Sequence, residues 1–257
     1  MSSTQPSLKV AIITGAAQGI GRRTAELFAT AGYTLALLDL KPCPPLPDAD
    51  VLAFTGDLTD ESFVASSIAA THKRFGRIDT LVNNAGISNI SPAETIDAAT
   101  FRRVLEVNLV SPFLLSRIAG TIMLEQRQGS IVNIASIAGL FGIADRSAYN
   151  ASKHGLVGLT RTLAAEWGGR GVRVNAVCPG WVKTEMDHVD QAKGTYTDAD
   201  ITDRIPMARF ATPDDIARAV LFLADPTQSP FINGQTLTVD GGWTADASWQ
   251  SLRLSHR

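Results

Sequence analysis

Short apolar runs alternate with longer amphipathic stretches along nearly the whole chain, and this alternation constrains the fold more than any other feature. The runs have strand length, are rich in β-branched residues and stay apolar at successive positions. Such strands are buried on both faces, which is typical of a parallel sheet covered by helices on both sides. The predicted strands are 10–13, 34–38, 51–54, 80–82, 130–134, 172–177 and 236–239. Helices are expected near residues 19–30, 60–75, 97–106, 111–127, 147–167 and 213–223.

Two stretches do not follow this alternation of predicted strands and helices. Residues 41–50 (KPCPPLPDAD) hold four prolines and therefore cannot form a regular helix, so we expect an extended connection between the second and third strands. Residues 185–205 are polar and poorly periodic, which predicts a flexible flap. No Gly/Ser-rich linker divides the chain, so residues 1–257 are predicted to form one domain with a C-terminal tail at 244–257.

Composition argues against several classes of function. The net charge is −2 and 19% of the residues are charged, which gives no reason to expect a nucleic acid as a partner. Cys43 and Cys178 form no CxxC pair, so we expect no disulfide framework and no metal site, and a reducing cytoplasm is the simplest location. We identify no signal peptide and no run of the roughly 20 apolar residues that a membrane helix needs, so no membrane association is expected.

A glycine-rich segment, TGAAQGIG at 14–21, connects the first predicted strand to the first predicted helix. Its spacing is GxxxGxG rather than GxGxxG, but glycine serves the same physical purpose. The backbone can approach a pyrophosphate, and the helix start offers free N–H groups and the positive end of the helix dipole. A turn that needs glycine only for its conformation is the alternative. The strand–loop–helix context favours dinucleotide binding.

Asp39 ends the second predicted strand, about 20 residues beyond the glycines, where a ribose-binding carboxylate is expected. There it would accept hydrogen bonds from both ribose hydroxyls and repel a 2′-phosphate, which favours NAD over NADP. Lys41 would soften that repulsion, but no arginine follows the acid directly. A solvated aspartate at a strand end is the alternative.

Further motifs follow in order: Asp57 in GDLTD, Asn83-Asn84-Ala85-Gly86, Asn108, Ser136, YNASK at 149–153, Pro179-Gly180 and Asp240-Gly241-Gly242. With the glycine loop, they make the chain resemble the classical short-chain dehydrogenase/reductase family from about residue 9 to residue 243. The resemblance implies an α/β fold with a Rossmann-type doubly wound sheet of seven parallel strands and helices on both faces. The chain departs from many members at 41–50, where they have a helix, so we expect the adenosine side of the pocket to be more open.

The resemblance also implies roles for individual positions. Asp57 would lie near the adenine, Asn84-Ala85-Gly86 would support the central sheet and the cofactor, and Thr184 would bind the nicotinamide carboxamide. The catalytic tetrad would be Asn108, Ser136, Tyr149 and Lys153. The cofactor, NAD, would be bound by Gly15, Gln18, Gly19, Ile20, Gly21, Asp39, Asp57, Leu58, Asn84, Ala85, Gly86, Tyr149, Lys153, Pro179, Gly180, Val182 and Thr184.

The physical chemistry of the tetrad agrees with these roles. Tyr149 and Lys153 lie four residues apart, on one face of a predicted helix. A free tyrosine has a pKa of about 10, and a nearby ammonium group favours the phenolate, so Tyr149 is expected to be the acid/base. Ser136 would polarise the substrate oxygen, and in the family Asn108 anchors a water that links the lysine to solvent. A solvent-exposed helical pair is the alternative for Tyr149 and Lys153 taken alone.

Three functions are compared. The first is NAD(H)-dependent interconversion of a secondary alcohol and a ketone in a small polar compound such as a polyol, a sugar or a hydroxy acid. The second is reduction of 3-oxoacyl groups on a carrier protein or coenzyme A, because carrier reductases often have basic residues where Arg127 and Arg170 stand, expected at the mouth of the site. The third is a non-catalytic nucleotide-binding regulator, against which the intact tetrad argues. The expected substrate pocket is formed by Ser88, Asn89, Ile90, Ile137, Ala138, Phe141, Tyr149, Trp181 and Met186, with His188 at the surface.

The predicted helices at 111–127 and 147–167 carry more apolar residues than one core-facing stripe needs, which indicates burial on a second side. In the family these helices form a contact between subunits, so we expect a homotetramer. The tail contains Trp249, Leu252 and Leu254 and is expected to dock on a neighbouring subunit. The apolar residues on the two helices are Val110, Phe113, Leu114, Leu115, Ile118, Ile122, Met123, Leu156, Val157, Leu159, Leu163 and Trp167.

Overall fold

The computed structural model describes residues 9–47, 49–185, 196–249 and 252–253. Its strands form one parallel sheet in the order β3-β2-β1-β4-β5-β6-β7. The predicted seven-stranded parallel sheet is thus confirmed. The strands are β1 (Lys9–Thr14), β2 (Tyr33–Asp39), β3 (Val51–Thr55), β4 (Thr80–Asn83), β5 (Gly129–Ile134), β6 (Val172–Pro179) and β7 (Thr236–Val239).

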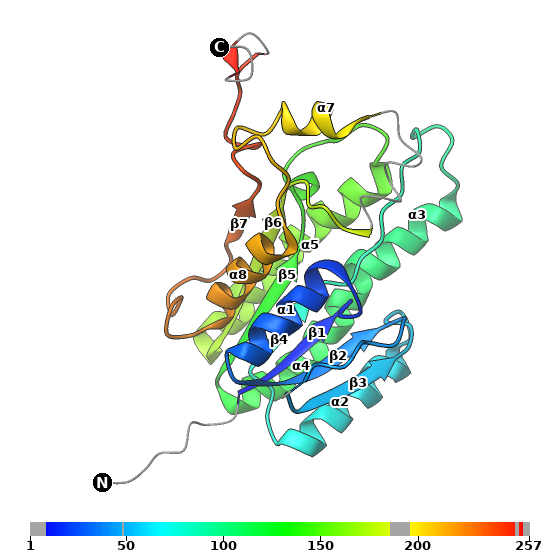
Figure 1. Cartoon of the computed structure of the whole chain (residues 1–257). Helices are drawn as coiled ribbons and strands as arrows, with labels where there is room; N and C mark the ends of the chain where they lie inside the picture. The colour runs from blue at the N-terminus through cyan, green and yellow to red at the C-terminus, as the bar shows by residue number, and fades with distance from the viewer. Residues whose placement is uncertain (1–8, 48, 186–195, 250–251, 254–257) are drawn as a thin grey trace.

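Helices cover both faces of this sheet (Figure 1). Neighbouring strand residues point to opposite faces, so Ile12 of β1 packs with α2, α4 and α5, whereas Ile13 packs with α1 and α8. This two-sided burial explains why the strands are continuously apolar. The helices are α1 (Gly19–Thr30), α2 (Glu61–Phe75), α3 (Ala98–Leu105), α4 (Ser111–Gln126), α5 (Ser147–Trp167), α7 (Asp198–Thr202) and α8 (Pro213–Ala224).

The helices predicted near 97–106 and 111–127 are present as α3 and α4, but they are continuous with each other. A π-helical turn at Glu106–Val110 joins α3 and α4 into one helix, Ala98–Gln126, and a window of 18 residues within it has a mean hydropathy of 1.5. By length and composition this helix is able to cross a membrane, contrary to the expectation that no such segment exists. Its buried side chains, among them Leu115 and Met123, pack in the core against the sheet, which is the ordinary reason for such apolarity in a folded domain.

The order of the strands positions the site. From β1 the chain runs outward through β2 to β3 and then returns to β4 on the other side of β1. The loops at the carboxyl ends of β1 and β4 therefore diverge, and the crevice between them is where open α/β sheets bind ligands. The described residues of the connection between β2 and β3, 40–47 and 49–50, contain no helix, as predicted. Arg22 of α1 donates hydrogen bonds to the carbonyls of Pro44 and Pro45 in that connection.

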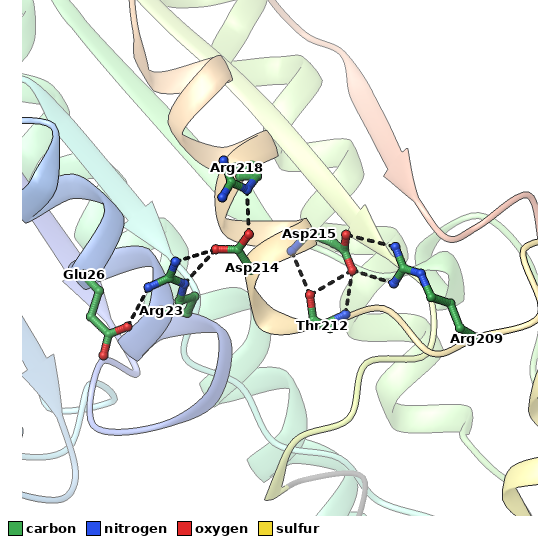
Figure 2. Close-up of polar contacts among 7 residues, drawn as sticks. All are labelled: Arg23, Glu26, Arg209, Thr212, Asp214, Asp215 and Arg218. Atoms are coloured by element: carbon green, nitrogen blue, oxygen red, sulfur yellow. Dashed lines mark hydrogen bonds and ion pairs between the residues drawn. The ribbon is translucent and has the colours of Figure 1, made fainter.

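Helix α8 packs beside α1, the helix that follows the glycine loop. Figure 2 shows Arg23 of α1 bonded to both Glu26 and Asp214, and Asp214 in turn accepts a hydrogen bond from Arg218. Thr212 and Asp215 form a capping box at the start of α8. These contacts tie the first turn of α8 to α1, close to the cleft described next.

Candidate active site

A cleft of about 420 Å³ runs along the carboxyl edge of the sheet. Two predicted site residues, Gly21 and Asn108, do not line it. The other predicted cofactor and catalytic residues all do: Gly15, Gln18, Gly19, Ile20, Asp39, Asp57, Leu58, Asn84, Ala85, Gly86, Ser136, Tyr149, Lys153, Pro179, Gly180, Val182 and Thr184. Residues after β2 and β3 form one end of the cleft, called here the adenosine end. Residues after β5 and β6, with the start of α5, form the other, called here the substrate end.

The glycine loop makes a closely packed turn between β1 and α1. Gly15 and Gly19 have φ angles of 64° and 56°, which L-residues with side chains rarely adopt. A Cβ atom on Gly21 would lie 2.0 Å from the carbonyl oxygen of Gly15, so this glycine allows the loop to fold against the helix rather than facing the cleft. The Gln18 side chain makes no capping hydrogen bond and the first turn of α1 contains no acidic residue, so the helix start suits an anion.

Asp39 stands at the carboxyl end of β2, as the sequence predicted, and lines the adenosine end. Its two carboxylate oxygens accept hydrogen bonds from the backbone N–H groups of Ala17 and Lys41, each at 2.9 Å. Arg22, in the first turn of α1, is engaged with Glu26 and with the proline-rich connection. The carboxylate is therefore fixed between the glycine loop and the strand end.

Asp57 lies after β3 at the same end of the cleft. The backbone N–H of Thr59 and the guanidinium of Arg103 both donate to its carboxylate and hold its pKa below the usual value, although partial burial opposes them. Arg103 also lines the cleft and was not among the predicted site residues. Asp57 and Arg103 thus form a charged wall around the expected adenine position.

Lys153 is buried, and it lines the substrate end of the cleft. Its Nζ atom donates to the carbonyl oxygen of Ile134, at 2.8 Å, and lies 5.6 Å from the centroid of the Tyr149 ring. Burial lowers the pKa of Lys153 to about 8, because the charged form is poorly solvated there. A Cβ atom on Gly86 would lie 3.3 Å from Oδ1 of Asn108, a tight contact, and 3.6 Å from Nζ, an ordinary one.

Asn108 lies behind the cleft rather than in its wall. It belongs to the π-helical turn and is fully buried. Its side-chain amide pairs with the backbone of Ile87, at 2.9 Å in both directions, and donates to the hydroxyl of Ser152 at 3.1 Å. Asn108 therefore joins the loop after β4 to the catalytic helix α5, and a π-turn is a common device for aiming a side chain at a functional site.

Ser136 follows β5 and caps a 3₁₀ turn at Ile137–Gly139 by accepting a hydrogen bond from the N–H of Ala138, at 3.1 Å. It lines the cleft together with Tyr149 and Lys153. The structure thus brings three members of the predicted tetrad to one end of the cleft and holds Asn108 directly behind them. A hydroxyl, a phenol and an ammonium gathered in this way can bind an alcohol oxygen and exchange its proton.

The cleft fits a nicotinamide dinucleotide. The uncapped start of α1 suits the pyrophosphate, Asp39 is placed for a ribose, and the substrate end carries the proton-transfer groups. Among the described residues, no group of three or more His, Cys, Asp and Glu side chains is able to hold a metal ion.

Known proteins share this sequence and this fold. The family model described as "Enoyl-(Acyl carrier protein) reductase" matches residues 15–244. D-threitol dehydrogenase from Mycolicibacterium smegmatis is 42% identical over 248 residues, which cover 92% of this chain and 93% of that protein. The chain belongs to the short-chain dehydrogenase/reductase family. It is therefore an oxidoreductase of the kind that uses a nicotinamide cofactor to act on alcohols and ketones.

Two other relatives show the range of this family. The 3-oxoacyl-[acyl-carrier-protein] reductase FabG from Thermotoga maritima is 37% identical over 243 residues, covering 91% of this chain and 97% of that protein. A crystal structure from Beutenbergia cavernae is described as an NAD(P)-dependent gluconate 5-dehydrogenase with NADP bound at low occupancy. It is 39% identical, with a TM-score of 0.83, and the match covers 93% of this chain and 97% of that chain.

From the sequence, Arg127 and Arg170 are expected at the mouth of the site. Within a single chain of this short-chain dehydrogenase/reductase, that expectation is wrong. Arg127 caps the end of α4, directly before β5, and Arg170 precedes β6. Both therefore lie at the amino ends of their strands, whereas the cleft follows the carboxyl ends. A strand of six residues separates the two edges by roughly 20 Å.

The substrate end differs from the sequence expectation in part. Ser88, Ile137, Tyr149 and Trp181 line it as predicted, but Asn89, Ile90, Ala138 and Phe141 do not. Met186 and His188 lie outside the described residues, as do the other flap residues up to 195. The residues that the prediction missed include Ile87, Ile143 and Arg146. Arg146 stands three residues before Tyr149. On a helix this spacing places two residues on the same face, so it could have identified Arg146 as a residue of the site.

Proposed function

We propose that the protein is an NAD(H)-dependent dehydrogenase that interconverts a secondary alcohol and a ketone in a small polar hydroxy compound, such as a polyol or a sugar. The observation that carries this proposal is the position of Lys153, which is buried beside Tyr149 and bonded to the end of β5, next to Ser136. That arrangement supplies a proton-transfer phenol, a cation to stabilise its phenolate and a hydroxyl for the substrate oxygen.

In the oxidative direction, the Ser136 hydroxyl binds the substrate oxygen and Tyr149, as phenolate, takes the proton of the substrate hydroxyl. A nicotinamide dinucleotide bound in the cleft would supply the hydride acceptor that the conversion of an alcohol into a ketone needs. The Lys153 ammonium favours the phenolate form of Tyr149. Asn108 positions α5 through Ser152, which keeps the lysine and the tyrosine aligned.

The preference for NAD rests on Asp39. A carboxylate at this place accepts hydrogen bonds from ribose hydroxyls and repels a 2′-phosphate. Arg22 does not offset this charge directly, because its guanidinium bonds to Glu26, Pro44 and Pro45. Lys41 is the nearby cation, and its Nζ atom lies 3.4 Å from the side-chain oxygen of Gln18.

Two other functions are weighed against this one. Reduction of 3-oxoacyl groups is supported by the relationship to a carrier-protein reductase, but Arg127 and Arg170 lie at the opposite edge of the sheet within the chain. A non-catalytic nucleotide-binding regulator would not need Ser136, Tyr149 and Lys153 around one end of the cleft. The polyol and sugar-acid dehydrogenases among the relatives favour a small polar substrate.

The decisive test is Tyr149→Phe. This substitution keeps the ring and removes the hydroxyl, so kcat should fall by about 10³-fold, within the range typical of a lost general acid/base. NADH binding, measured by fluorescence, should stay close to that of the unmodified protein, because most cofactor contacts lie elsewhere. Tyr33→Phe removes the same hydroxyl from a tyrosine buried against Phe28 and serves as the control. Near-normal turnover by Tyr149→Phe would refute the proposed chemistry.

A further inference from the structure

Glu185 brings a carboxylate to the start of α1, where the helix itself favours an anion. Its Oε2 atom lies 3.4 Å from the point that a Cβ atom on Gly19 would occupy. Gly19 is the first residue of α1 and the second glycine of the glycine loop. In dinucleotide-binding loops, glycine at the second position lets the backbone approach the pyrophosphate closely. The Glu185 carboxylate therefore lies beside the place that the pyrophosphate of a cofactor needs.

The surroundings of Glu185 give this side chain room to move aside. It follows Thr184 in the loop after β6, and Cγ2 of Thr184 lies 3.6 Å from the same point beside Gly19. Both residues line the cleft together with the glycine loop. With Gly19 they also line a second cavity of about 460 Å³, which extends along α1 to the start of α8. Glu185 is thus an exposed side chain on the border between the cleft and this second cavity.

The charge of Glu185 is not balanced by a cation of its own. In the part of the chain that the structure describes, Glu185 takes part in no ion pair. Three basic side chains line the second cavity with it, and each is bonded to another carboxylate. These pairs are Arg22 with Glu26, Arg23 with Glu26 and Asp214, and Lys183 with Asp198. The Glu185 carboxylate is therefore free to interact with the helix start or to repel a bound phosphate group.

We propose that Glu185 competes with the cofactor pyrophosphate for the start of α1 and thereby weakens the binding of NAD and NADH. In the cofactor-free protein, its carboxylate lies in the favourable field at the positive end of the helix dipole. A pyrophosphate has to displace this carboxylate, and the two negative groups repel each other wherever both stay near the loop. Moderate affinity has a use in turnover, because product release limits the rate of many enzymes.

The test is the binding of NADH to Glu185→Gln, which keeps the size of the side chain and removes its charge. Measured by fluorescence titration at low ionic strength, this variant should bind NADH about three- to tenfold more tightly than the unmodified protein. The difference should shrink at high ionic strength, because salt screens charges that are exposed to solvent. Glu166→Gln makes the same change of net charge at an exposed position near the end of α5 and should leave the affinity unchanged.

Two partial ligands locate the effect at the pyrophosphate. Inorganic pyrophosphate, measured as a competitor of NADH, should bind Glu185→Gln more tightly than the unmodified protein. Adenosine carries no phosphate and should bind both proteins equally. Equal affinity of both proteins for NADH, or a gain for adenosine as large as that for pyrophosphate, would overturn the inference and leave the proposed function standing. An unmodified protein that binds no NADH would instead overturn the proposed function together with this inference.

Discussion

At the residue scale, Asp39 is the group on which cofactor choice depends. Its carboxylate is fixed by the N–H groups of Ala17 and Lys41, so it cannot easily turn away from a 2′-phosphate. We expect a kcat/KM for NAD about 10- to 100-fold above that for NADP. Asp39→Ser should narrow this gap by removing the repulsion while keeping a hydrogen-bonding group. Steady-state kinetics with both cofactors provide the measurement, and equal efficiency in the unmodified protein would contradict the prediction.

Lys153 shows how a catalytic group reduces stability. Burial lowers its pKa from 10.5 to about 8, so folding at pH 7 must bury an ammonium that water solvates better. Lys153→Met should therefore raise the free energy of unfolding of the cofactor-free protein at pH 7 by ~2 kcal/mol, after allowing for the lost bond to Ile134. Turnover should be lost.

The pH dependence gives the sign of the Lys153 effect. Between about pH 8 and pH 10.5 the unfolded chain keeps this proton while the folded chain has released it. The free energy of unfolding of the unmodified protein should therefore rise with pH in that window relative to Lys153→Met, and the difference between the two should shrink. Denaturant unfolding at pH 7 and pH 10 measures it. A difference that does not change with pH would show that Lys153 has the same pKa in the folded protein as in the unfolded chain.

At the scale of elements, the start of α8 holds part of the cleft wall. Thr212 and Asp215 form its capping box, and Arg209 bonds the same carboxylate and holds the pKa of Asp215 well below its usual value (Figure 2). The residue just before the cap, Ala211, exchanges backbone hydrogen bonds with Trp181 and Lys183 in the loop after β6. The cap therefore fixes the loop that carries Trp181, Val182 and Thr184 at the substrate end.

Thr212→Ala should lower the free energy of unfolding by about 1 kcal/mol, the usual effect of losing an N-cap side chain. Because the loop after β6 would become less ordered, KM for the cofactor should rise as well. Thr121→Ala is the matched control, since Thr121 is exposed within α4 and bonds only the carbonyl of Arg117. Thermal unfolding and cofactor titration compare the two variants, and equal losses would argue against a specific capping role.

At the scale of the whole molecule, fewer apolar residues of α4 and α5 are exposed for contacts between subunits of the expected tetramer than the sequence suggested. Leu115, Met123, Leu156, Val157, Leu163 and Trp167 are buried inside the chain itself. Phe113 of α4 remains 42% exposed, and Val110, Leu114, Ile118, Ile122 and Leu159 are half-buried. A second copy packed against α4 and α5 would cover these apolar side chains.

Light scattering at micromolar concentration should therefore report a mass near that of four chains. Phe113→Glu should reduce the mass, because it places a charge in the expected contact. Thr30→Glu introduces the same charge at the exposed end of α1, on the opposite face of the sheet, and should not. A monomeric mass for the unmodified protein would contradict the predicted assembly.

The tail is tied to its own chain by Arg204, which bonds both the carboxylate and the carbonyl oxygen of Asp246, yet Trp249 is 69% exposed. We expect the tail to dock on a neighbouring subunit. A chain that ends at Trp243 should then have a smaller mass by light scattering or a lower activity. Unchanged mass and activity would show that the tail has no such role.

The sequence by itself determined the strands, most of the helices and most of the cleft lining. Strand and helix periodicity are local properties, so the apolar runs predicted all seven strands. The prolines at 41–50 predicted that the connection between β2 and β3 is not a regular helix. Residues that directly follow a strand, such as Asp39, Asn84 and Ser136, necessarily meet at the carboxyl edge once the sheet is parallel. Their place in the cleft therefore follows from chain order.

Only the tertiary structure decided which residues lie at the substrate end, because that depends on how loops from distant strands pack against α5. Arg146 enters the cleft through contacts with Ser88 and Trp181, which are far from it in sequence. Asn108 lies behind the cleft lining because its side-chain amide pairs with the backbone of Ile87. Arg127 and Arg170 are carried to the opposite edge because they precede their strands, and strand direction assigns each edge of a parallel sheet a different role.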